Sequence, residues 1–295
     1  MPRLSIVVTT YEWPEAFDAV LASLEDQSDQ SFDLVVADDG SGPATALVVD
    51  RWALVFGDRL RHAWQPDEGF RVARVRNLGA LAARGDVLVF LDGDCVVRRG
   101  FVAAIRRAAL PGWFLAGKRV QLSDGLSRRV LDHELRIGRR TALGHLLASR
   151  REIDSWIDLT PRDRRRPWRP RLPDFAPEGN AYGFMTAVTR SDFESVNGFD
   201  MRFVGWGEQD VDLAIRLGRR GLRCGFAGPH STVFHLAHAS QMSADRETWW
   251  LLQETQRSSH VEAELGLREL AAETECAAGS PHRPQPSAAA DHSGR

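Results

Sequence analysis

The stretch Val87-Leu88-Val89-Phe90-Leu91-Asp92-Gly93-Asp94 decides how the rest of this sequence is interpreted. Its first five residues form an unbroken apolar run, which is typical of a parallel strand buried on both faces of a sheet. In open α/β sheets ligands bind beyond the carboxyl ends of the strands, where Asp92 and Asp94 stand. Carboxylates suit Mg²⁺ and Mn²⁺, and Gly93 lets a diphosphate approach closely. Asp-Gly is also a common turn, but the preceding strand favours a metal site.

Short β-rich runs and helical patterns alternate on the N-terminal side of this stretch. We expect strands at Leu4–Thr10, Asp33–Ala37, Leu60–Trp64 and Val87–Leu91. Helical spacing of apolar residues falls between them, at Glu15–Asp26, Ala44–Phe56 and Val72–Ala83. The β-α-β-α-β-α-β order predicts an α/β fold with a Rossmann-like, mostly parallel sheet and flanking helices.

The composition excludes several classes of protein. The 295 residues are 43% hydrophobic, enough for a large core, and the net charge of −2 argues against a nucleic-acid partner. The three cysteines lie far apart without a CxxC pair, which argues against structural zinc and disulfides and favours a cytoplasmic compartment. No apolar run approaches the roughly 20 residues of a transmembrane helix. The sequence does not decide whether the protein makes a peripheral contact with the inner face of the membrane.

The second half of the chain is less regular. We expect helices at about Ser127–Ser149, Asp210–Arg220 and Thr248–Ala272, and strands at Gly183–Arg190, Cys224–Ala227 and Thr232–Leu236. Ser191 is the expected cap of the helix after the first of these strands. Arginines crowd residues 162–171, either as a solvated loop or as a lid that faces an anion. The predicted domains are 1–240, with halves 1–117 and 118–240, a helical extension at 241–274 and a disordered tail at 275–295.

Two further clusters carry groups suited to chemistry. Asp38 and Asp39 end another parallel strand, where a carboxylate could accept hydrogen bonds from a base N–H and a ribose hydroxyl. In Gly205-Trp206-Gly207-Glu208-Gln209-Asp210, the tryptophan could support a sugar face. An acid at the start of the following helix could serve as a general base or simply cap the helix.

His235 and His238 stand three apart in an apparent strand. Residues three apart in a strand point to opposite faces, so we expect no more than one of them to bind a metal shared with the aspartates. A lone histidine is more often a packing or surface group, and the pattern does not decide which of the two would be the ligand.

The ordered set of motifs resembles glycosyltransferase family 2 with a GT-A fold and a C-terminal galactosyltransferase-type module. Leu4–Tyr11 resembles the family's opening strand, and Val35–Ser41 resembles its nucleotide-binding strand end. Val75-Arg76-Asn77-Leu78-Gly79 is similar to the helix that precedes the DxD motif at Asp92–Asp94. The likeness covers about 4–110 and 180–238, and the second part contains the motif that ends at Asp210.

The resemblance implies a role for individual residues. Nucleotide binding would fall to Thr9, Tyr11, Asp38, Asp39, Arg71, Arg74, Asp92 and Gly93, with Thr9 and Tyr11 flanking uracil and Asp39 accepting its N–H. Asp94 and His235 would bind Mn²⁺ or Mg²⁺, and Asp210 would be the general base. Trp206, Gly207, Glu208 and Gln209 would contact substrate. Gln209 replaces the family's usual glutamate, which puts the identity of the donor sugar in doubt.

The expected function is therefore inverting transfer of a hexose or N-acetylhexosamine from a UDP-sugar to a carbohydrate or glycoconjugate hydroxyl. One alternative is a catalytically inactive GT-A protein that binds carbohydrate or nucleotide, although the carboxylates at Asp92, Asp94 and Asp210 are all retained. Another is a sugar-phosphate nucleotidyltransferase. Such enzymes open with a Gly-rich basic loop, whereas residues 10–14 here read Thr-Tyr-Glu-Trp-Pro.

Overall fold

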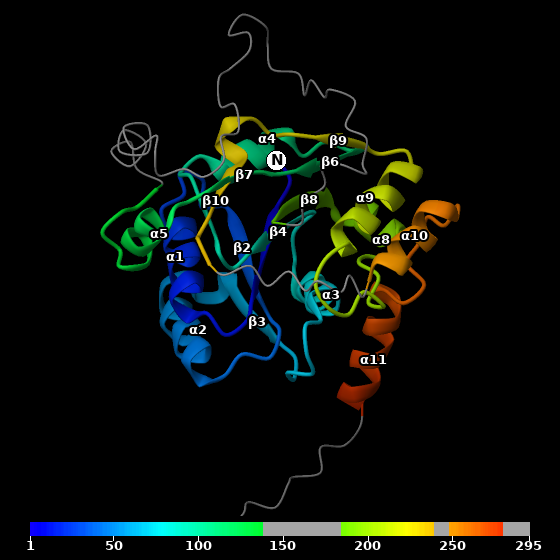
Figure 1. Ribbon diagram of the computed structural model, residues 1–295, viewed down its shortest axis with the longest axis horizontal. Helices are drawn as coiled ribbons and strands as arrows, with labels where there is room; N and C mark the ends of the chain where they lie inside the picture. Colours follow the sequence, from blue (N-terminus) through cyan, green and yellow to red (C-terminus); the bar gives the residue numbers. More distant parts are fainter. Residues whose placement is uncertain (138–183, 239–247, 280–295) are drawn as a thin grey trace, which may run out of the picture.

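The computed structural model describes residues 1–137, 184–238 and 248–279, which form two β-sheets covered by helices (Figure 1). Among these residues the larger sheet has the order β3-β2-β1-β4-β8-β6-β9 and the smaller one the order β5-β10-β7. The strands are β1 Leu4–Thr10, β2 Phe32–Asp38, β3 Leu60–Trp64, β4 Val87–Asp92, β5 Cys95–Val97, β6 Trp113–Ala116, β7 Lys118–Gln121, β8 Met185–Thr189, β9 Arg223–Gly225 and β10 Thr232–His235. The α-helices are α1 Pro14–Glu25, α2 Pro43–Phe56, α3 Val72–Ala82, α4 Phe101–Ala108, α5 Asp124–Leu131, α8 Arg190–Ser195, α9 Gln209–Arg219, α10 Trp249–Arg257 and α11 Leu267–Gly279.

Strand β1 lies at the centre of a parallel half-sheet, with β2 on one side and β4 on the other, and β3 extends the pairing beyond β2. Successive side chains of a strand point to opposite faces. Ile6 and Val8 accordingly pack with helices α1, α2 and α4, whereas Val7 packs with α3. This arrangement confirms the predicted α/β class and the mostly parallel, Rossmann-like sheet with flanking helices.

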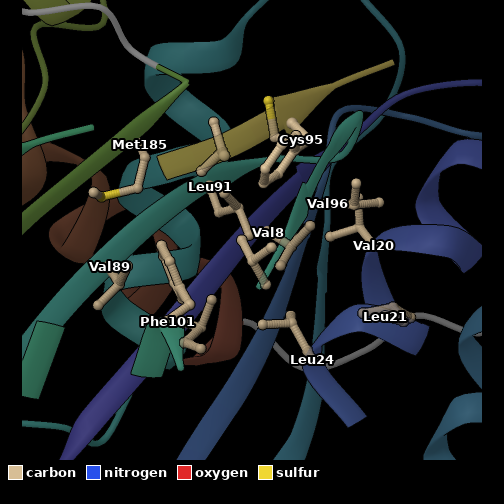
Figure 2. Close-up of a cluster of buried hydrophobic side chains, with 14 of the residues drawn as sticks. Val8, Val20, Leu21, Leu24, Val89, Leu91, Cys95, Val96, Phe101 and Met185 are labelled. Carbon is tan, nitrogen blue, oxygen red and sulfur yellow. The ribbon is translucent and has the colours of Figure 1, made fainter. Parts of the chain in front are cut away.

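The core on the α1 side of the sheet is a continuous apolar layer (Figure 2). Helix α1 is buried over most of its length, and all three residues of strand β5 belong to the same apolar layer. The labelled members are Val8, Val20, Leu21, Leu24, Val89, Leu91, Cys95, Val96, Phe101 and Met185. All ten are at most 2% exposed, so the strand ends that carry the polar motifs stand on a rigid base.

The expected strand at 183–190 is β8, and it runs antiparallel to both β4 and β6. Its end differs from the prediction, because Thr189 rather than Ser191 caps helix α8. The Thr189 Oγ1 accepts a hydrogen bond from the backbone N–H of Asp192 at 3.1 Å. Strand β8 thereby joins the C-terminal half of the chain to β4, directly beside the strand that leads into Asp92-Gly93-Asp94.

The small sheet brings distant parts of the sequence together. Strand β5 begins immediately after Asp94, and β10 pairs with it so that His235 lies opposite Cys95. On its other side β10 pairs with β7 in parallel. The register therefore places the end of β10 beside the second aspartate of the motif.

Two helix predictions need correction. The single helix expected at Thr248–Ala272 is two helices, α10 and α11, because the chain passes tightly over Asn197 between them. A side chain at Gly266 would collide with the Asn197 carbonyl oxygen, and Glu269 accepts the Gly266 N–H at 2.7 Å. The helix expected at 127–149 starts earlier, as α5, and ends at Leu131.

Other expectations fall partly outside the described residues. The continuation of the 127–149 prediction beyond residue 137 and the arginine-rich segment 162–171 lie outside them. Helix α11 continues to Gly279, so the predicted disordered tail is wrong for residues 275–279, and the remainder lies outside. In the part of the chain that is described, no helix has the length and apolarity needed to cross a membrane.

Candidate active site

The polar motifs meet at one edge of the larger sheet, where β1, β2 and β4 end. Thr9 lies opposite Asp92 and Thr10 lies opposite Asp38 in the parallel register. Gly93 has a packing reason to be glycine, because a side chain there would collide with the carbonyl oxygen of Thr9. The sequence motif is thus fixed to β1 by close backbone contact as well as by its strand.

Asp92 is paired with an arginine to which the sequence analysis gave no role. The Arg76 Nη2 donates to Asp92 Oδ1 at 2.7 Å, and the Nε lies 3.4 Å from Thr9 Oγ1. The guanidinium is buried and lies over the Phe199 ring, 5.3 Å from its centre. Arg76 shares the buried stripe of α3 with Ala73 and Ala80. An arginine at a core-facing position of a helix was the sequence signal that could have revealed this contact.

Asp94 contacts two histidines. Its Oδ2 lies 3.3 Å from His235 Nε2 and 3.2 Å from His238 Nε2, and the two imidazole nitrogens are 3.4 Å apart. The expectation that these histidines point apart is therefore wrong. Strand β10 ends at His235, so strand alternation does not extend to His238. The chain turns there, held by the Leu236 N–H, which donates to the Asp94 carbonyl at 2.9 Å.

The two carboxylates of the motif differ in their electrostatics. Burial raises the pKa of Asp92, opposed by Arg76 and reinforced by the charge of Asp94. Burial also favours the neutral form of Asp94, but hydrogen bonds from His235 and His238 outweigh it and hold the pKa of Asp94 below its usual range. Asp94 is thus the carboxylate kept ionised and ready to meet a cation.

The residues around Asp94 fit a divalent metal ion. A carboxylate oxygen, the His235 imidazole and the Cys95 sulfur lie within 4.8 Å of one another. The thiol acts differently from the other two, because it donates a hydrogen bond to Asp94 Oδ1 at 3.3 Å. Burial and the neighbouring carboxylates raise the pKa of Cys95 well above its usual value, so sulfur stays a neutral thiol that orients Asp94.

The two aspartates that end β2 have different surroundings. Asp38 is 1% exposed, and its carboxylate accepts the Ser41 N–H at 2.8 Å and lies 3.0 Å from His62 Nε2. Through those contacts Asp38 holds the loop after β2 and strand β3 against the end of β2. Asp39 accepts the Arg71 N–H at 2.9 Å and a hydrogen bond from the Gln65 side chain, and burial raises its pKa.

Tyr11 stands at the mouth of this region. Its side chain is 45% exposed, and its hydroxyl donates to Asp67 Oδ2 at 3.1 Å, which raises the tyrosine pKa. Gly40 adopts a φ of +99°, and a side chain there would come within 2.5 Å of the Asp67 backbone. The glycine lets the loop after β2 lie against the Asp67 loop, which brings Tyr11, Asp39 and Asp67 together.

The arginines expected at the diphosphate have partners elsewhere. The Arg71 guanidinium donates to Glu68 at 2.6 Å and to the Pro66 carbonyl at 2.5 Å. Arg74 donates to Gln65 at 2.8 Å and to Glu273 of α11 at 2.7 Å. In the structure it is Arg76, and neither of these two, that contacts the aspartate motif.

The segment before α9 has an unusual backbone. Gly205 and Gly207 have φ of +98° and +96°, and Glu208 has φ of +71°. Its anchors are a hydrogen bond from the Gly205 N–H to the Phe70 carbonyl, 2.9 Å, and one from Thr248 Oγ1 to the Gly207 carbonyl, 3.1 Å. The ring of Trp206 remains 48% exposed.

Helix α9 begins directly after this segment. Glu208 makes no side-chain capping bond, whereas Asp210 accepts backbone N–H groups of the first turn. Gln209 is 7% exposed, and its Oε1 has no hydrogen-bond partner among the described residues.

Asp210 lies within electrostatic range of the aspartate motif. Burial raises its pKa, Arg76 opposes that rise, and the charge of Asp92 reinforces it. The charges of Arg76 and Asp92 therefore act on the carboxyl group at the start of α9. A carboxyl group whose pKa is raised by burial is suited to proton transfer.

A comparison with known protein families decides the relationship. Residues 5–160, more than half of the chain, match the profile of glycosyl transferase family 2. The chain belongs to that family. Residues 172–239 of this family 2 protein match a second profile, described as the N-terminal domain of galactosyltransferase.

Two curated relatives of this family 2 protein are longer than it is. Validoxylamine A glucosyltransferase of Streptomyces hygroscopicus subsp. jinggangensis (strain 5008) is 30% identical over 271 residues, a match that covers 82% of this chain and 59% of the relative. Hyaluronan synthase of Pasteurella multocida is 25% identical over 232 residues, covering 74% and 23%. The chain thus spans about three fifths of the first relative and a quarter of the second.

Solved structures confirm the GT-A fold of the family 2 chain. Residues 1–349 of S. aureus TarS superpose with a TM-score of 0.61 at 13% identity, covering 91% of this chain and 68% of that fragment. GalNAc-T7 with UDP, GalNAc and Mn²⁺ gives 0.57 at 16% identity, covering 85% and 46%. The mannosyltransferase PcManGT from Pyrobaculum calidifontis, in complex with GDP-Man and Mn²⁺, gives 0.54 at 17% identity, covering 96% and 77%.

Proposed function

We propose that this protein is a metal-dependent, inverting glycosyltransferase that moves a hexose or N-acetylhexosamine from a UDP-sugar to a hydroxyl of a carbohydrate or glycoconjugate. The observation that carries this proposal is the cluster of Asp94 with His235 beside the Arg76–Asp92 pair, with Asp210 in electrostatic range of Arg76 and Asp92. Family membership supports the same reaction class.

The nucleotide half of the donor would bind at the ends of β1 and β2. Asp39 is a buried carboxylate that could accept the imide N–H of uracil, and the exposed Tyr11 ring could stack on the base. Thr9 would flank the base from the end of β1. Because GalNAc-T7 holds UDP and PcManGT holds GDP-Man, the choice of UDP has to be tested directly.

The diphosphate half would bind across Asp92-Gly93-Asp94. Asp94 and His235 would hold Mn²⁺ or Mg²⁺, which when bound offsets the charge that grows on the departing nucleoside diphosphate. Asp92 would face the ribose, oriented by its hydrogen bond from Arg76. Arg76 would thereby hold Asp92 in place, and its positive charge would offset that of the Asp92 carboxylate beside the phosphates.

Asp210 would take the proton from the acceptor hydroxyl as its oxygen attacks the anomeric carbon. A single displacement by that oxygen inverts the anomeric configuration. The partly exposed Trp206 would support a sugar face, and Gly207, Glu208 and Gln209 would contact the donor or acceptor sugar. The Gln209 Oε1, which has no hydrogen-bond partner within the described ranges, is suited to accept a hydrogen bond from a sugar hydroxyl.

The division of labour follows from these assignments. Residues 1–117 would bind the nucleotide, residues 118–240 would bind the acceptor and supply the base, and the following helices would support both. Residues 138–183 of that second half lie outside the described part of the chain.

The test is a screen of nucleotide sugars with Mn²⁺, scored by release of free nucleoside diphosphate. Release from a UDP-sugar supports the proposal, and release from a GDP-sugar alone would correct the nucleotide. Binding of nucleotide and metal without release from any donor would favour a non-catalytic binding protein. Release of pyrophosphate from a sugar 1-phosphate and UTP would favour the nucleotidyltransferase alternative.

A further inference from the structure

We propose that His238 is a second imidazole ligand of the metal site, so that Asp94, His235 and His238 together select a transition-metal cation such as Mn²⁺ over Mg²⁺. This inference rests on the proposed function, which assigns the cation to Asp94 and His235 and leaves the contribution of His238 open.

The three potential ligand atoms form a nearly equilateral triangle. Asp94 Oδ2 lies 3.3 Å from His235 Nε2 and 3.2 Å from His238 Nε2, and the nitrogens are 3.4 Å apart. The point equidistant from the corners of such a triangle lies about 1.9 Å from each, just short of the roughly 2.0–2.1 Å of metal–nitrogen and metal–oxygen bonds. A cation slightly off the plane would therefore reach all three atoms without rearrangement.

His238 is held in this position by the surrounding structure. The Ala237 N–H donates to Ser127 Oγ of α5 at 2.7 Å, which fixes the chain just before His238. The imidazole packs edge-on against Trp13, with ring centres 5.5 Å apart, and lies 5.0 Å from the His235 ring. Preorganised ligands lose little conformational entropy on binding, so both imidazoles are available to one ion.

The carboxylate of Asp94 divides its two oxygens between different tasks. Oδ2 faces both imidazoles, and Oδ1 accepts the hydrogen bond from Cys95. The thiol therefore orients the carboxylate from the side opposite the triangle. The three-atom set is one carboxylate and two imidazoles on one side of the cation, which leaves its other side for diphosphate oxygens.

This ligand set determines which cation binds best. Mg²⁺ prefers oxygen ligands in near-ideal octahedral geometry, whereas imidazole nitrogen suits first-row transition metals. With one imidazole, Mg²⁺ and Mn²⁺ could compete. With two, the preference shifts toward Mn²⁺ and later members of the series.

The test measures metal binding directly. Mn²⁺ affinity is titrated with and without UDP, with Mg²⁺ as competitor, for the wild type, His238→Gln and His235→Gln. His260→Gln is the matched control, because His260 is an exposed histidine that pairs with Glu264 on another part of the surface. We expect His238→Gln to raise the Kd for Mn²⁺ at least tenfold. Loss of a residue that only hydrogen-bonds to a metal ligand already costs about that much. The effect on Mg²⁺ should be smaller, and the control should bind both ions like the wild type.

A second measurement counts the imidazole ligands directly. Pulsed electron paramagnetic resonance of bound Mn²⁺ should detect two imidazole nitrogens in the wild type and one in His238→Gln. A single nitrogen in the wild type, or unchanged Mn²⁺ affinity in His238→Gln, would overturn the role of His238 and leave the proposed function intact. Failure of the wild type to bind any divalent cation, with or without UDP, would overturn both.

Discussion

At the scale of single residues, the site is organised around one buried guanidinium. Arg76 donates to Asp92, stacks on Phe199 and lies within electrostatic range of Asp210. A guanidinium presents five donors in a rigid planar fork that also stacks on aromatic rings, a geometry that the ammonium group of a lysine cannot reproduce. Arg76 therefore pairs with the Asp92-Gly93-Asp94 motif and acts through its charge on the proposed base.

This role predicts that Arg76→Lys lowers turnover by more than the same substitution does at a buried arginine that has only a structural role. The charge is kept, but the second hydrogen bond and the ring stacking are lost, and we expect kcat to fall at least tenfold, equivalent to about 1.4 kcal/mol. Arg106→Lys is the control, because Arg106 is similarly buried and pairs with Asp29 near the start of the chain. Steady-state kinetics with the donor found in the screen would measure both. Equal losses in the two variants would show that Arg76 is only structural.

The raised pKa of Asp210 has consequences for activity as a function of pH. A general base must be ionised, so kcat should fall as the pH drops through the raised pKa of Asp210, above the usual carboxyl range. A pH–rate profile measures this fall. An acid limb at the ordinary carboxyl pKa would contradict the assignment.

The raised pKa of Asp210 should affect stability in the opposite direction, since lowering the pH removes a destabilising contribution. A carboxyl whose pKa is higher in the folded than in the unfolded state takes up protons on folding. Its unfavourable effect is therefore absent at pH values below both pKa values and complete above the folded one. Asp210→Asn should accordingly raise the melting temperature at neutral pH and lose that advantage in acid. Melting curves across this range would show a constant difference if the pKa were not shifted.

At the scale of elements, the register of the strands and the tightness of the turns set the positions of the side chains. The β5–β10 register sets His235 opposite Cys95, and the tight contact of Gly93 with the Thr9 carbonyl fixes the turn between β4 and β5. Both features depend on backbone positions more than on side-chain chemistry.

Gly93→Ala should therefore destabilise the protein, because its added carbon meets backbone atoms that cannot move aside. We expect a loss of about 2–3 kcal/mol in the free energy of unfolding in urea, in the upper range of single substitutions. Gly125→Ala is the control, since a side chain in that first turn of α5 meets no atom within 4 Å. A loss in Gly93→Ala no larger than in Gly125→Ala would contradict the packing account.

The same elements show what the sequence could and could not predict. Apolar runs and turn residues located β1 to β4 to within a residue or two, because buried parallel strands have a strong local signature. The pairing of His238 with Asp94 was missed, because it depends on where β10 ends and on a turn held by long-range hydrogen bonds. The break between α10 and α11 was missed likewise, because it follows from contact with Asn197, 69 positions before Gly266.

At the scale of the whole molecule, the C-terminal helix is part of the structure that supports the site. Helix α11 packs on α3, the helix that carries Arg76, and Arg74 pairs with Glu273. Asn197 holds the N-terminal end of α11, because its side chain donates to Glu269 at 2.8 Å and accepts the Arg268 N–H at 2.9 Å. Helix α11 is thus tied to α3 through Glu273 and to the segment after α8 through the buried side chain of Asn197.

Asn197→Ala should loosen this connection. Asn197 is fully buried with a φ of +59°, a conformation that asparagine tolerates better than alanine, and its removal leaves buried partners unsatisfied. We expect a loss of about 2–3 kcal/mol in unfolding free energy and faster amide hydrogen exchange in α11 than in β1. Unchanged exchange in α11 would show that other contacts hold the helix.

The most direct test of the central claim compares wild type and Asp210→Asn in donor binding and in turnover. The amide keeps the size of the side chain but cannot accept the acceptor's proton. Donor and Mn²⁺ should bind the variant with a Kd close to that of the wild type, while transfer to acceptor should fall by at least 10²-fold, the lower end of the contribution of a general base. Near-normal transfer by Asp210→Asn would contradict the account.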